Sequence, residues 1–263
     1  MNKMEFIDTH LHLYDEAYDV DFNEVLERMK SAGVVKCVLP AIDSTTYNRQ
    51  LECAIKCAGY AYEAMGVHPT SVKENFRSEL DFALGKLYDK SNSYVAVGEI
   101  GLDGYWSKEF MTEQIAAFKE QVVAASELDL PIIIHLREAT EELFKALDEL
   151  KGIKQRGVLH AFSGSSELYE RISKYGDYSV GIGGVVTFKN ASVAESLTRI
   201  PLERVVLETD APWLTPAPFR GKRNESSYLT YIADKIAQIK EIEIDKVSEI
   251  TTKNALSLFR LTK

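Results

Sequence analysis

Short apolar runs rich in β-branched residues alternate with longer amphipathic stretches along the whole 263-residue chain. Most of the runs are nearly continuous apolar segments, which is typical of strands buried on both faces of a parallel sheet. The expected strands are Glu5–Asp8, Val34–Pro40, Ala61–Val67, Tyr94–Ile100, Ile132–His135, Gly157–His160, Tyr178–Ile182 and Arg204–Glu208. This alternation predicts an α/β fold in which helices cover a parallel sheet.

The stretches between the runs have the periodicity of amphipathic helices. The expected helices are Phe22–Ala32, Thr45–Ala58, Glu79–Lys90, Glu109–Leu128, Ala139–Leu150, Ser227–Ile239 and Ile244–Phe259. Eight strands, each followed by a helix, predict a single (β/α)8 TIM barrel of the metal-dependent hydrolase type over residues 1–263. A doubly wound open sheet is the alternative, but it usually has fewer strands, and its ligand loops gather at one switch point.

Composition limits the classes of partner. With 45% hydrophobic residues the chain can bury a large core without disulfides, and its three cysteines have no C-x-x-C spacing. The formal charge of −9 excludes a broad basic face for duplex DNA, so any nucleic acid must be held locally. The opening MNKMEFIDTH has no signal-peptide pattern, and no apolar run has the length of a membrane span. We therefore expect a cytoplasmic protein with no membrane partner and no dinucleotide cofactor.

All the histidines fall at or just beyond the carboxyl ends of expected strands, and two acids occupy matching positions. These seven residues are His10, His12, His68, Glu99, His135, His160 and Asp210. Strand carboxyl ends of a barrel converge on one mouth, where active sites lie. Imidazole and carboxylate are natural ligands for Zn, Mn and related ions, and the supply exceeds one tetrahedral site. The pattern predicts two divalent metal ions (Mg, Mn or Zn), about 3.5–4 Å apart.

Some individual assignments stay open at this level. His68 lies in GVHP, where it would either contact the substrate or fix the turn before Pro69. Asp8 is expected to hold the H-x-H loop from outside the ligand set. Glu208 and Asp210 share one strand face, so spacing does not decide between them.

An ordered set of motifs carries a family resemblance. They are FIDTHLHL (Phe6–Leu13), GVHP (Gly66–Pro69), VGEIGLD (Val97–Asp103), LPIIIHLREA (Leu130–Ala139), HAFSG (His160–Gly164), LETDAPWLTP (Leu207–Pro216) and RGKRNE (Arg220–Glu225). In these motifs and their order the chain resembles the TatD family of metal-dependent deoxyribonucleases, within the amidohydrolase-like barrels.

The resemblance implies roles for individual residues. The implied metal ligands are His10, His12, Glu99, His135, His160 and Asp210. Glu99 would bridge the two ions and Asp210 would handle the proton of the attacking water, which makes both catalytic. Arg223 would grip a phosphate, although a helix-capping role for Asn224–Glu225 is the alternative for that motif. His68 is the other expected substrate contact, on the basis of its place in GVHP.

The implied activity is metal-dependent hydrolysis of DNA phosphodiester bonds, as an exonuclease on single-stranded ends that needs only local contacts. Tyr105 and Trp106 would stack a terminal base, with loop packing as the alternative for Trp106. Other hydrolases on the same site are the alternatives: a D-aminoacyl-tRNA deacylase, an amidohydrolase or a small phosphoesterase. A nucleic-acid adaptor with structural metals is a further one.

Overall fold

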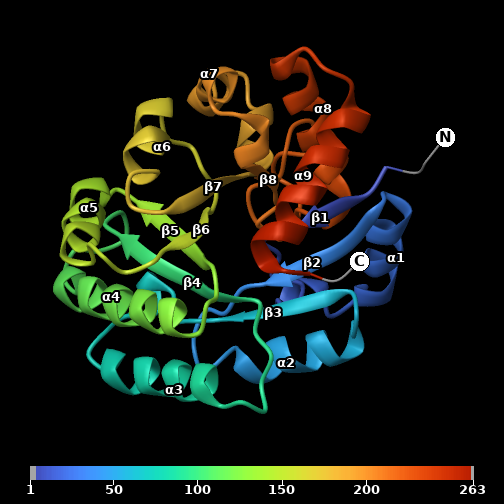
Figure 1. Cartoon of the computed structure of the whole chain (residues 1–263). Helices are drawn as coiled ribbons and strands as arrows, with labels where there is room; N and C mark the ends of the chain where they lie inside the picture. The colour runs from blue at the N-terminus through green and yellow to red at the C-terminus, as the bar shows by residue number, and fades with distance from the viewer. Residues whose placement is uncertain (1–3, 262–263) are drawn as a thin grey trace.

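The computed structural model describes residues 4–261, so the first three residues of the stretch considered for a targeting signal lie outside it. Eight parallel strands pair in sequence order, and the helices surround them (Figure 1). The strands are β1 (Phe6–Asp8), β2 (Val34–Leu39), β3 (Ala61–Met65), β4 (Ala96–Asp103), β5 (Ile132–Arg137), β6 (Arg156–Leu159), β7 (Asp177–Ile182) and β8 (Val205–Leu207). The Thr9 N–H donates to Leu207 O at 3.0 Å, and a parallel bridge joins Leu11 to Ala211. These bonds join the first strand to the last, and the predicted (β/α)8 barrel is confirmed.

The helices mostly follow the expected ranges. They are α1 (Phe22–Ser31), α2 (Tyr47–Lys56), α3 (Phe76–Tyr88), α4 (Met111–Glu127), α5 (Thr140–Glu149), α6 (Ser166–Ile172), α7 (Ser192–Arg199), α8 (Leu229–Lys240) and α9 (Ile244–Phe259). Two of them, α6 and α7, were not among the expected helices. With 7 and 8 residues they are shorter than the window of about 11–18 residues over which a helical period is read from a sequence.

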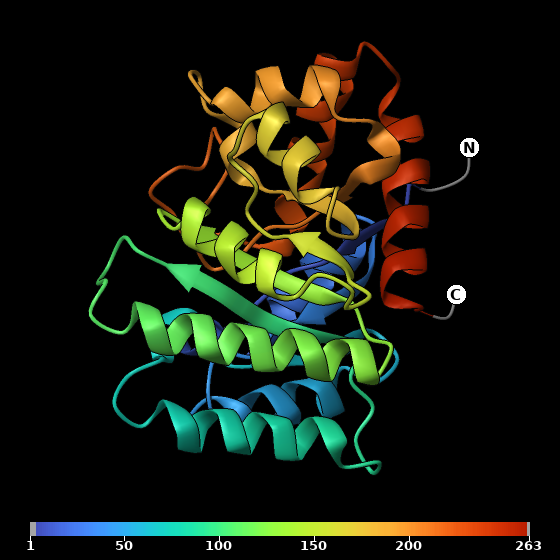
Figure 2. The ribbon, with the colours of Figure 1, turned by 60° about the vertical axis from the view of Figure 1, so that its left-hand side comes forward.

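Inside the barrel, side chains of seven strands form an apolar layer: Ile7, Val38, Ala64, Ala96, Ile133, Val158 and Val206. Phe259 of α9 packs into the same cluster. The Asn254 side chain of α9 donates to Leu202 O and Val205 O, at the start of β8. The last helix therefore covers the amino-terminal end of the barrel, while the strand arrows point away from it (Figure 2). The opposite, carboxyl end is left for the site.

No helix within residues 4–261 combines the length and the hydropathy that crossing a bilayer requires. The cytoplasmic location expected from the sequence stays a prediction.

Candidate metal centre

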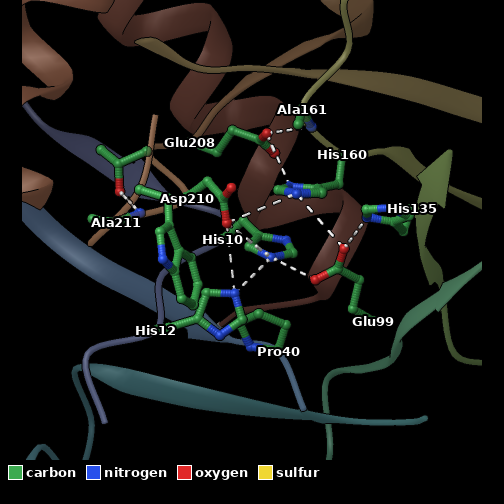
Figure 3. Close-up of polar contacts among 12 residues, drawn as sticks. His10, His12, Pro40, Glu99, His135, His160, Ala161, Glu208, Asp210 and Ala211 are labelled. Atoms are coloured by element: carbon green, nitrogen blue, oxygen red, sulfur yellow. Dashed lines mark hydrogen bonds and ion pairs between the residues drawn. The ribbon is translucent and has the colours of Figure 1, made fainter. Parts of the chain in front are cut away.

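The residues singled out at the strand ends converge at the carboxyl end of the barrel, and Figure 3 shows all of them except His68. Their nitrogen and oxygen atoms form three groups compact enough to hold an ion. The groups are His10–His12–Glu99, His10–His160–Asp210 and His68–Glu99–His135. Residues separated by up to 200 positions in the chain are thus brought within ligand distance of one another.

Glu99 of β4 lies at the centre of the site and belongs to two of the three groups. Its Oε2 is 3.0 Å from His10 Nε2, and its Oε1 is 2.9 Å from His135 Nδ1. Burial would raise the pKa of this carboxyl, but the charges of the surrounding imidazoles hold it well below its usual value. Oε2 faces His10, whereas Oε1 faces His68, His135 and His160, so the two oxygens contact different imidazoles, as a bridging carboxylate requires.

Asp210 follows β8, and its backbone is in the left-handed region at φ 55°. The Asp210 N–H donates to His10 O at 3.0 Å, which ties this turn to the first strand. Its Oδ1 lies 3.6, 3.8 and 3.9 Å from the Nε2 atoms of His12, His10 and His160, respectively. The Asp210 side chain is 15% exposed, against 3% for Glu99. Of these two carboxylates, Asp210 is therefore the one that faces both the imidazoles and the solvent.

Hydrogen bonds on the outer side of the site fix the tautomer of His12. Its Nδ1 lies 2.8 Å from the hydroxyl of Tyr14, and that hydroxyl donates to Pro40 O at 2.5 Å. Because the phenol has only one proton, it must accept from His12 Nδ1–H. The lone pair of His12 is thereby left on Nε2, which faces the cluster.

Two other imidazoles are oriented by carboxylates. His135 Nε2 lies 2.8 Å from Asp103 Oδ2, and His160 Nδ1 lies 3.0 Å from Glu208 Oε1. Asp103 accepts from the outer nitrogen of His135 and leaves the inner nitrogen free for a metal, while Glu208 forms a charge contact with the outer nitrogen of His160. Burial opposes charge on His160, but Glu208 and Glu99 outweigh it and raise its pKa to about 10. For His135, whose pKa rises to about 9, the hydrogen bonds to Asp103 and Glu99 outweigh burial in the same way. The negative potential at the centre favours a bound cation.

His68 has the opposite tautomer. Its Nδ1 accepts from the Thr70 N–H at 3.1 Å, so in the neutral ring the proton lies on Nε2. This Nε2 is 3.3 Å from Glu99 Oε1. His68 therefore both fixes the turn after β3 and presents an N–H to the centre. That geometry suits a hydrogen-bond donor better than a metal ligand.

Glu208 and Asp8 lie outside the ligand groups and support them. The Ala161 N–H donates to Glu208 Oε1 at 2.5 Å, and a Cβ on Gly181 would lie 2.0 Å from Glu208 Oε2. Glycine at this position is what leaves room for the carboxylate beside His160. Asp8 accepts from the Thr209 hydroxyl at 2.6 Å and, as expected, ties the H-x-H segment to the residues after β8.

Arg223 is engaged by neighbouring acids. Its guanidinium donates to both oxygens of Asp21, to Glu225 Oε1 and to Ala17 O. The adjacent Asn224 side chain donates to Thr209 O and Trp213 O, so this motif braces the turn that carries Asp210. The prediction that Arg223 grips a phosphate stays a prediction.

The donors present fit divalent metal ions. They are imidazole nitrogens and carboxylate oxygens, the set that Zn, Mn and related ions accept. His12 and His135 have their lone pairs directed inward by a hydrogen-bonded outer partner, and Glu208 lies against the outer nitrogen of His160. Sequence reasoning did not single out two of these partners, Tyr14 and Asp103. The one available signal for Tyr14 is its position two residues after His12, on the same face in extended chain.

Comparisons with known proteins identify the family to which the chain is related. The profile of the family described as TatD related DNase matches residues 7–260. The metal-dependent hydrolase YabD of Bacillus subtilis is 42% identical over 255 residues, which cover 97% of this chain and 98% of YabD. The crystal structure of the TatD homologue YjjV from Escherichia coli superposes with a TM-score of 0.90 at 28% identity, covering 98% of this chain and 99% of YjjV. A TatD-family hydrolase from Entamoeba histolytica has the same fold, with a TM-score of 0.82 at 24% identity, covering 98% of this chain and 99% of that one.

Proposed function

Since the chain belongs to the TatD-related DNase family and is a metal-dependent hydrolase, we propose that it hydrolyses phosphodiester bonds at single-stranded DNA ends. The proposed metal ligands are His10, His12, Glu99, His135, His160 and Asp210, for two divalent ions (Mg, Mn or Zn). Glu99 and Asp210 are the proposed catalytic carboxylates. His68 and Arg223 are the proposed substrate contacts.

Bound divalent ions would supply Lewis-acid activation of water and of the phosphoryl oxygen. The protein's own residues do the remaining work. Asp210 accepts a proton at a carboxylate oxygen that reaches the mouth of the barrel. Glu99 contacts His10 with one carboxylate oxygen and His135 with the other, and so fixes the two groups of ligands relative to each other. His68 donates from Nε2 to an oxygen that gains negative charge.

The observation that supports this proposal best is the position of Asp210. It combines partial exposure with distances of 3.6–3.9 Å to three imidazole nitrogens, so water can meet an acceptor beside the ligand cluster. A purely structural site would be expected to close all its positions to solvent.

The test uses metal-stripped protein re-loaded with Mg, Mn or Zn. Single-stranded DNA labelled at either the 3′ or the 5′ end is added, with Asp210→Asn as the matched variant. Metal-dependent release of mononucleotides that disappears in Asp210→Asn would support the proposal, and the labelled end gives the direction of digestion.

Intact DNA with every metal, at a measured metal content of two ions per chain, would refute the DNA assignment. The same preparation would then be tested on small phosphate esters, amides and aminoacyl-tRNA.

A further inference from the structure

Arg137 lies at the mouth of the barrel and differs from Arg223, whose guanidinium is paired with Asp21 and Glu225. Arg137 ends β5 and is exposed. Within residues 4–261 its guanidinium makes no ion pair and no hydrogen bond, and its contacts are with aromatic rings. Its Cζ lies 3.5 Å from the ring centroid of Tyr105 and 5.6 Å from that of Trp106. A guanidinium stacked on a ring keeps its five N–H donors at the edge, available to a ligand.

The position of Arg137 relative to the metal centre follows from the strand. It lies two residues beyond His135, and alternate residues of a strand share a face. His135 points into the ligand cluster, so Arg137 is on the same side, one step closer to the solvent. The Arg137 side chain therefore lies at the open end of the barrel, on the solvent side of His135.

The aromatic partners are anchored to the same site. Asp103 Oδ1 accepts from the backbone N–H groups of Tyr105 and Trp106 at 2.9 and 3.2 Å, while Oδ2 is the partner of His135. The Gly104 N–H donates to Arg137 O at 2.8 Å. The loop after β4, which extends beyond the strand tip in Figure 2, is thus fixed at its base to a proposed metal-binding residue.

The exposure of the rings decides between the two alternatives for Trp106. Trp106 is 71% exposed and Tyr105 is 48% exposed, so Trp106 is not holding the loop together by burial. On this acidic chain, a cation without an acidic partner next to open aromatic rings has the chemistry of a site for one nucleotide unit. The guanidinium binds a phosphate, and an indole face stacks a base.

We propose that Arg137, supported by Tyr105 and flanked by Trp106, holds the phosphate and base of single-stranded DNA next to the cleaved bond. This inference rests on the proposed function and adds specificity residues to it. In this proposal Arg137 is a phosphate-binding residue at the mouth of the barrel.

The test measures binding apart from turnover. Fluorescein-labelled dT12 is titrated into the metal-loaded Asp210→Asn protein, and anisotropy gives the Kd at several salt concentrations. Adding Arg137→Gln is expected to weaken binding about tenfold or more and to lower the slope of log K against log salt by about 0.7. Arg137→Lys should restore the slope, because it restores the charge. Trp106→Ala should weaken binding roughly 5- to 100-fold with the slope unchanged.

Arg77→Gln is the matched control, since Arg77 on α3 also lies over a ring, that of Phe76 at 5.2 Å, but its guanidinium is already paired with Glu120 of α4. If dT12 binds and Arg137→Gln behaves like Arg77→Gln, the inference is wrong and the proposed function stands. Unchanged affinity in Trp106→Ala would refute the stacking part. If dT12 does not bind and the wild-type protein does not cut it, both proposals fail.

Discussion

The hydroxyl of Tyr14 lies 2.8 Å from Nδ1 of His12 and donates its own proton to Pro40 O, so it decides which nitrogen of His12 is free for a metal. A side chain outside the ligand set thereby controls a ligand. Outer partners of this kind commonly affect metal affinity by about 10- to 100-fold.

Tyr14→Phe removes this acceptor and keeps the ring. We expect metal affinity to fall about 10- to 100-fold, measured by competition with a chromophoric chelator, while the far-ultraviolet circular dichroism stays the same. Tyr178→Phe is the control, because it also removes a buried hydroxyl, bonded to Gln155 Oε1 at 2.7 Å, but touches no histidine. Equal losses in the two variants would contradict the orienting role.

Gly181 and Gly183 offer a matched pair around Glu208. A Cβ on Gly181 would lie 2.0 Å from Glu208 Oε2, whereas the nearest atom to a Cβ on Gly183 is 3.7 Å away. Gly181→Ala should displace the carboxylate from His160 and lower metal affinity about tenfold or more, while Gly183→Ala should not. Isothermal titration with Mn on both variants checks this, and a normal affinity in Gly181→Ala would show that Glu208 does not support the site.

Metal content should separate the roles of three residues at the centre. Glu99→Ala is expected to lose both ions, because Glu99 belongs to two ligand groups. His135→Ala should retain one ion. His68→Ala should retain two ions and lose activity, because its Nε2 carries a proton. Elemental analysis after gel filtration gives the stoichiometry, and loss of an ion in His68→Ala would make His68 a ligand instead.

The ion pair between Arg223 and Asp21 should make the free energy of unfolding depend on pH. Hydrogen bonds from Arg223 outweigh burial and, with help from Arg28, lower the pKa of Asp21 to about 2 from its ordinary 3.8. Because the pKa is lower in the folded state, the ionised carboxylate stabilises the fold above pH 3.8, and this contribution is lost as the pH falls towards 2.

Asp21→Asn should therefore lower the urea midpoint at pH 7, and its difference from wild type should shrink below about pH 4. In an Arg223→Gln background Asp21→Asn should lower the urea midpoint by less, because Arg223, the main partner of Asp21, is already gone. A difference that stays constant from pH 7 to pH 3 would exclude the ion pair as its cause.

The barrel and the cluster could be predicted from the sequence because both depend on periodic features. Apolar runs mark buried strands, and the barrel brings strand ends together, so His10 and Asp210 were placed side by side without a structure. The tautomers of His12 and His68 could not be predicted, because they depend on Tyr14, Pro40 and Thr70, which have no distinguishing pattern.

The arginines show the same limit. Sequence motifs singled out Arg223, whose donors are occupied by Asp21 and Glu225. Arg137, which has no acidic partner within the described residues, also lies in a motif, LPIIIHLREA, but no role was assigned to it. A sequence gives the type of each residue, but the tertiary fold decides which charged groups a side chain contacts.

The hydrogen bond from Asp210 N to His10 O crosses the seam between the first and last strands of the barrel. During synthesis, His10 and His12 leave the ribosome about 200 residues before their acidic partner, so one proposed metal site cannot exist until nearly the whole chain is made. Contacts so distant in sequence form late in folding. An ion that binds there links the first strand of the barrel to the last. We expect its removal to weaken the contacts between these two strands before any other part of the barrel.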